Sequence, residues 1–216
     1  MYLAKTINEV LESKKDKLIG RPTYYYICHV LNKAFSNIEP FKFKHETYEE
    51  YGIEDYSVSG IYDMEEDVKY IILNFPKSCK TFTLKPERWK EFKFAVSQVC
   101  QHEAIHQCQW SYVSDPQLRE RDKEKLDFRN TEGSIDEEQE YLADTDEIDA
   151  YGHDIAMEIA FYYPKKNPYK VLQDINKHRK IWSYKYYKRT YKNEDWSLIR
   201  NRLLKKAYKW IPHVHI

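Results

Sequence analysis

VCQHEAIHQCQW, residues 99–110, places two histidines on either side of a glutamate within about one helical turn. The run that contains it starts after Pro86, a residue tolerated at the first turn of a helix. Apolar residues recur along this run on one stripe that also carries both histidines. We therefore predict a long helix over residues 87–110, with HEAIH near its C-terminal end; the stripe comprises Phe92, Ala95, Val99, His102, His106 and Gln109.

The spacing of the two histidines is typical of a metal site. A helix turns about 100° per residue, so His102 and His106 project from the same face one turn apart and can reach a single ion. Zinc prefers such nitrogen ligands. Glu103 points about 100° away from His102, where it can contact a water held by the metal. The pattern predicts Glu103 as the general base of a hydrolytic zinc site.

A catalytic zinc site usually has three protein ligands and leaves the fourth position to water, so a third ligand must come from downstream. Helical placement favours Glu147, which opens a helix over residues 146–163 and has the small Ala150 about one turn later. His153 is an alternative ligand. It lies on a different side of that helix from Glu147, so a supporting or substrate-polarising role suits it better. The acids considered are Asp136, Glu137, Glu138, Glu140, Asp144, Asp146, Glu147 and Asp149.

Other side chains near these positions have two interpretations. Tyr141 and Tyr151 could each donate a hydrogen bond to a developing oxyanion, or could pack in the interior, as most of the 20 tyrosines should. Cys100 and Cys108 flank the motif but point away from the histidine face, so we expect core packing rather than thiolate ligation. The four cysteines, which also include Cys28 and Cys79, show no CxxC spacing and indicate reduced thiols.

The composition favours an α+β fold that is mostly helical, since 216 residues include only 5 glycines and 32% charged residues. The segments 57–63 and 68–75 are rich in β-branched and aromatic residues and flank the polar MEED, which predicts a hairpin that Pro76 closes. Gly20 should end a first helix and Pro22 should open a second. The predicted helices span 2–17, 22–36, 87–110, 146–163, 169–190 and 195–210; a polar excursion with at most a short helix spans 114–146.

The charge is distributed unevenly although the net charge is zero. Residues 161–216 hold 15 Lys or Arg against 3 Asp or Glu, and the remaining residues hold 20 against 32. The run SYKYYKRTYK (183–192) suits phosphate contacts and base stacking, and it equally suits a helix that lays its lysines over an aromatic base. We expect residues 1–163 to form the main domain and residues 164–216 a basic, aromatic-rich helical segment packed on it. This segment could contact a nucleic acid.

No run of about 18 apolar residues occurs, which predicts that the chain does not enter a membrane. Its beginning, MYLAKTINEVLESKKDK, is amphipathic and lacks the apolar core and the cleavage site of a signal peptide. Both features favour a cytoplasmic protein, in the host cytoplasm if a phage encodes it.

HEAIHQCQ followed by EIDAYGHDIA resembles the small gluzincin-type zinc metallopeptidases of bacteria and their phages, over about residues 57–160. The resemblance implies a zincin-like core with a small sheet, an active-site helix and helical N- and C-terminal additions. It matches His102, His106 and Glu147 to the zinc ligands and Glu103 to the catalytic base. It also matches VKYIILNF (68–75) to the edge strand that holds an extended substrate.

The separation of 41 residues between His106 and Glu147 is longer than in many compact relatives, and no third histidine follows shortly after His106. We expect zinc-dependent hydrolysis of a protein or peptide substrate, with His153 and Tyr151 as further candidate catalytic residues. Two alternatives remain open: a nucleic-acid-binding protein and a structural zinc protein, in either of which the HExxH site is not catalytic.

Overall fold

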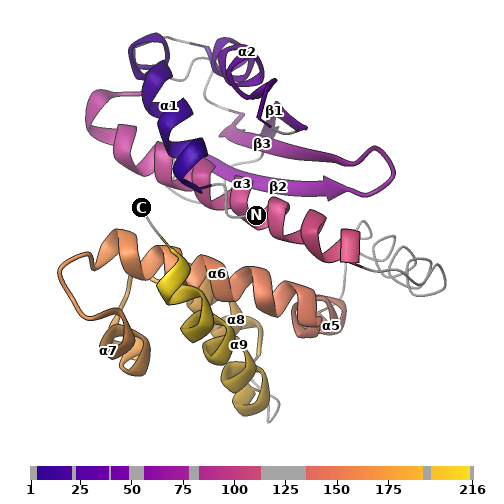
Figure 1. Ribbon diagram of the computed structural model, residues 1–216, viewed down its shortest axis with the longest axis vertical. Helices are drawn as coiled ribbons and strands as arrows, with labels where there is room; N and C mark the ends of the chain where they lie inside the picture. The colour runs from indigo at the N-terminus through magenta and orange to yellow at the C-terminus, as the bar shows by residue number, and fades with distance from the viewer. Residues whose placement is uncertain are drawn as a thin grey trace. The chain divides into compact units, whose positions relative to one another are not determined.

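The computed structural model describes residues 4–20, 23–38, 40–48, 56–77, 83–112, 135–191 and 196–214. It is an α+β structure in which helices predominate and one small sheet is present among the described residues, as predicted (Figure 1). The chain divides into two compact units, Met1–Gln107 and Cys108–Ile216. The division falls within one continuous helix, α3 (Trp89–Tyr112). It differs from the expected boundary after residue 163, which lies inside the second unit.

The first unit confirms the N-terminal helices, the hairpin and the long helix predicted from the sequence. Thr23 caps the second helix, since its Oγ1 accepts a hydrogen bond from the Tyr26 amide at 3.3 Å. Gly20 ends the first helix at a φ of +76°, which glycine adopts without strain. Pro22 lies outside the described residues. The elements are α1 (Ala4–Leu18), α2 (Tyr24–Phe35), β1 (Phe41–Tyr48), β2 (Ser57–Asp63), β3 (Val68–Pro76), η1 (Pro86–Arg88) and α3.

The sheet has the order β1-β3-β2, with β1 parallel and β2 antiparallel to β3. Strand β1 was not predicted from the sequence. Its pairing with β3 makes β3 an internal strand of the sheet. Because β3 is paired on both sides, the expectation that residues 68–75 form a substrate-holding edge strand is wrong. Among the described strands, β1 and β2 are the two outer strands, one on each side of β3.

A single apolar core holds α1, α2, the sheet and α3 together in the first unit. The side chains of β3 are buried on both faces, which fits a central strand. Figure 1 shows α3 running along the sheet, and this packing positions the HEAIH turn. Fully buried members of the core include Ile7, Leu11, Leu31, Phe35, Ile71, Leu73, Phe75, Phe92 and Val96.

The second unit is helical throughout its described residues, and α6 packs against both α8 and α9. Gly152 permits close approach, since a Cβ there would lie 2.6 Å from the Lys206 Cβ and 3.0 Å from the Ala207 nitrogen. The helix before residue 163 and those after it therefore share one core. The elements are α5 (Ile135–Ala143), α6 (Thr145–Tyr162), α7 (Pro168–Gln173), η2 (Ile175–Lys177), α8 (Trp182–Thr190), α9 (Trp196–Trp210) and η3 (Ile211–His213).

The single helix predicted over residues 169–190 is wrong. The chain forms α7, η2 and α8 there, and Asp174 caps the end of α7. A buried carboxylate from α6 starts α8: Glu158 accepts hydrogen bonds from the Ser183 amide at 3.2 Å and from its hydroxyl at 3.0 Å. This interaction fixes a new helix start that local sequence preference does not encode.

Of the polar excursion expected over 114–146, residues 114–134 lie outside the described residues, and the short helix α5 follows them. Within the parts of the chain that the structure describes, no helix combines the length and apolar character needed to cross a bilayer.

Candidate metal centre

His102 and His106 lie on consecutive turns of α3, and their side chains meet. The two Nε2 atoms are 3.1 Å apart, and the ring centroids are separated by 4.8 Å with the rings inclined at 70°. Two ligands that are each about 2.0–2.1 Å from a tetrahedral zinc ion lie roughly 3.3 Å apart. The histidine pair thus has the separation that two zinc ligands require.

Glu147 is positioned by the second unit. Asp144 caps α6, its side chain accepting from the Asp146 amide at 2.9 Å, so that Glu147 lies in the first turn. Gln109, in the last turn of α3, donates a hydrogen bond to the Asp146 carbonyl at 3.1 Å. This bond joins the last turn of α3 to the residue before Glu147 within the second unit. The Glu147 carboxylate is buried, at 1% exposure.

Among the described residues, His102, His106 and Glu147 form a group that could hold a metal ion. Each residue offers one ligand atom, and these atoms all lie within 4.8 Å of one another. Two neutral imidazoles and one carboxylate are a donor set that zinc accepts. These are the three residues that the sequence nominated as ligands, and zinc binding by them stays a prediction.

Several of the other candidate acids have different roles in the second unit. Asp144 is the α6 cap described above. Asp149 accepts from the Trp210 indole and pairs with Lys206, both at 3.1 Å. Glu138 accepts from the Tyr186 hydroxyl at 2.7 Å. The side chain of Asp136 lies outside the described residues.

Glu103 is buried between α3 and the sheet, with 4% of its surface exposed. Its side chain lies directly against the backbone of Gly60 in β2. The carboxylate is thus held by the first unit on the turn of α3 that also carries His102.

The remaining catalytic candidates are held in the core of the second unit. His153 is fully buried, its ring packing edge-on against Trp210 at 5.1 Å, and its Nδ1 is 3.5 Å from an oxygen of Asp154. Tyr151 packs against the rings of Tyr186 and Tyr187 at 5.9 and 5.1 Å. Neither belongs to the metal-ligand group. Tyr141 also packs against the apolar core of this unit.

A polar network that the sequence analysis missed joins α3 to the hairpin next to His106. Lys69 is fully buried in β3; its ammonium donates to Gln107 and lies 4.9 Å from the centre of the Phe41 ring. Gln107 donates in turn to Asp67 at 2.7 Å, and Tyr62 donates to the same oxygen at 2.8 Å. These two bonds hold the pKa of Asp67 below its usual value. The signal in the sequence was Lys69, a charged residue within a strand of mostly apolar residues.

The described cysteines contribute no ligand to the group. Cys28 and Cys100 are buried, as expected, whereas Cys108 is half-buried. Burial raises the pKa of the Cys28 thiol to about 12, and burial also raises the pKa of Cys100 well above its usual value. Both thiols therefore stay protonated and serve as core residues. Cys79 lies outside the described residues.

The basic, aromatic run is largely the helix α8. Tyr184 and Tyr187 are buried, with 2% and 0% exposure, so these two rings are not available for base stacking. Lys185 lies 4.2 Å above the centre of the Trp182 ring. This arrangement matches the interpretation of lysines laid over an aromatic base. Nucleic-acid binding through the exposed cations of the segment stays a prediction.

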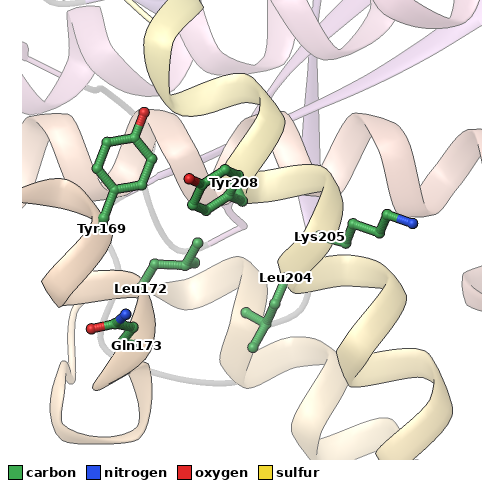
Figure 2. Close-up of a pocket in the computed structure, with 6 residues that line it drawn as sticks. All are labelled: Tyr169, Leu172, Gln173, Leu204, Lys205 and Tyr208. Atoms are coloured by element: carbon green, nitrogen blue, oxygen red, sulfur yellow. The ribbon is translucent and has the colours of Figure 1, made fainter.

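A shallow, largely apolar pocket of about 300 Å³ lies between α7 and α9 (Figure 2). None of the predicted site residues lines it, so it is separate from the metal-ligand group. Its lining consists of Tyr169, Leu172, Gln173, Leu204, Lys205 and Tyr208.

Comparisons with protein-family models, with curated proteins and with solved structures give no match. The case for a metal centre therefore rests on the ligand group itself, and on the elements that hold each of its side chains.

Proposed function

We propose that the chain is a zinc-dependent peptidase with a zincin-like active site. The observation that carries the proposal is the convergence of His102, His106 and Glu147, with Glu103 buried on the same turn of α3. This combination provides a metal-binding face and a separate carboxylate on adjacent sides of one helix.

The donor set favours a catalytic rather than a structural zinc. A structural zinc ion is closed by four protein ligands, whereas the group found among the described residues has three. A zinc ion held by these residues would supply a Lewis acid that polarises a scissile carbonyl and makes water acidic enough to attack near neutral pH.

The residues of the chain supply the remaining steps. His102 and His106 would each hold the ion through a ring nitrogen of the neutral imidazole, so an imidazole that is protonated would have to lose that proton first. Glu103 accepts the proton of the attacking water and transfers it to the nitrogen of the leaving amine. An extended substrate would pair with β2 and not with β3, because β3 is internal and β2 lies against Glu103.

Removal of zinc tests this function. We expect the purified protein to generate new N-termini in a library of unfolded proteins, to lose at least about 90% of this activity when a chelator removes the metal, and to regain it with one equivalent of zinc. Mass spectrometry of the N-termini measures each state. Cleavage that persists after the zinc has been removed, or a zinc-loaded protein that cleaves nothing in the library, would contradict the proposal.

A further inference from the structure

The backbone of β2 approaches α3 unusually closely at Gly60. Gly60 pairs with Ile71 of β3. A Cβ built on Gly60 would lie 2.5 Å from the Glu103 Oε1, 2.6 Å from its Cγ and 2.7 Å from a methyl carbon of Val99. Non-bonded carbon atoms normally lie about 3.5–4.0 Å apart. Any side chain at position 60 would therefore occupy the space that holds Glu103.

The neighbouring turns of α3 prevent Glu103 from moving aside. Cys100, one turn earlier, is fully buried, and Val99 packs against the same core. One turn later, Gln107 is fixed by Lys69 and Asp67. The helix is thus held on both sides of Glu103, so that a group inserted at position 60 must displace the carboxylate side chain rather than the helix.

We propose that Gly60 is a positioning residue for the general base. The missing Cβ lets the Glu103 carboxylate lie against the β2 backbone, and this contact confines the side chain to one orientation beside the metal ligands of α3. The inference rests on the proposed function, because it assigns a catalytic purpose to the contact. It goes beyond that function by placing a determinant of catalysis in the sheet, outside the HExxH motif.

Replacing Gly60 with alanine tests the role. We expect kcat to fall roughly 10- to 100-fold with little change in KM, because a displacement of about 1 Å at a reacting group has an effect of this size. Zinc content should stay at about one per chain, since the atoms nearest to the new methyl group belong to Glu103 and Val99 rather than to a histidine. Tight packing should also lower the unfolding midpoint by on the order of 5 °C.

Gly20→Ala is the matched control for lost stability. Gly20 has a φ of +76°, and no atom lies within 4 Å of the place that a Cβ would take, so alanine there is strained without meeting another group. We expect its unfolding midpoint to fall by roughly 3 °C and its kcat to stay at the wild-type value. A Gly60→Ala variant that turns over substrate as fast as Gly20→Ala would overturn the positioning role.

A double substitution measures the contact without any substrate. Glu103→Ala removes two of the three atoms that crowd position 60, so Gly60→Ala should lower the unfolding midpoint less in that background than in the wild type. If the Gly60→Ala single variant does not fold but the double variant with Glu103→Ala does, the result supports the contact equally. Additive changes in the unfolding midpoint would overturn the proposed contact between Gly60 and Glu103. Failure of both Gly60→Ala and the double variant to fold would overturn it as well.

The two proposals fail in different ways. Additive stability changes overturn the role of Gly60 and leave the peptidase proposal intact. Wild-type cleavage by a variant without a carboxylate at position 103 overturns the peptidase mechanism and, with it, the catalytic purpose of Gly60.

Discussion

Replacing Glu103 with glutamine should reduce kcat at least about 100-fold while leaving the fold and about one zinc per chain in place. Glutamine has nearly the same size and shape, so it fits the space between α3 and Gly60 that the glutamate occupies. It cannot accept the proton of the attacking water at neutral pH, which removes the base without removing a ligand. Steady-state cleavage of an identified peptide, together with metal analysis of the same sample, measures both quantities.

The matched control is Glu91→Gln, the same substitution in the first turn of the same helix. Glu91 is exposed and pairs with Arg88 at 2.9 Å, and an exposed pair of this kind contributes little to stability. We expect this variant to cleave at the wild-type rate. If Glu103→Gln also cleaves at that rate, the proposed proton transfer is wrong.

Replacing Glu147 with alanine should weaken zinc binding at least about 100-fold, because loss of a direct ligand should exceed the 10- to 100-fold cost of losing a supporting residue around a zinc site. The side chain is buried in the first turn of α6, and truncation to alanine removes its carboxylate from the group. Competition with a chromophoric chelator measures the affinity.

Asp149→Ala provides the control for this effect. Asp149 lies two residues away on α6 but binds Trp210 and Lys206, so its loss should reduce stability and leave zinc affinity within about threefold of the wild type. Unchanged zinc binding by Glu147→Ala would mean that the third ligand is a different residue, with Asp144, Asp146 and His153 the next to be tested.

The N-terminal helices and the long helix α3 could be predicted, and the candidate ligands could be nominated, because their signals are local or periodic. The stripe along residues 87–110 requires a helix, and that helix places His102 and His106 one turn apart whatever surrounds it. Glu147 was favoured because it opens a helix, and the Asp144 cap explains why that helix starts where it does. The fold class followed from composition and from the hairpin at residues 57–75.

Strand β1, which was not predicted, is indicated by its local sequence, but its place in the sheet is set by a distant segment of the chain. FKFKHETY begins with alternating apolar and charged residues, and Phe41 and Phe43 are buried as this alternation would predict. Its parallel pairing with β3 joins segments that are far apart in the chain, which no local pattern specifies. For this reason the sequence indicated a strand at residues 68–75 but not that the strand would be internal.

The interrupted helix near the C-terminus and the role of Gly60 also depend on long-range contacts. Glu158 starts α8 from a position 25 residues earlier in the chain, so the propensity of residues 169–190 for one helix was overridden. A lone glycine in a strand is a known sign of close backbone approach. The sequence did not reveal that the approaching group would be Glu103.

X-ray absorption at the zinc edge of the purified protein tests whether His102, His106 and Glu147 hold a zinc ion, because the spectrum reports the metal, its ligand atoms and the number of imidazoles. We predict about one zinc per chain with only nitrogen and oxygen neighbours at about 2.0–2.2 Å, two imidazoles in the wild type and one in His102→Ala or His106→Ala. A protein that binds no zinc, a sulfur neighbour at about 2.3 Å, or an imidazole signal that neither histidine variant changes would show that these residues do not form the zinc site.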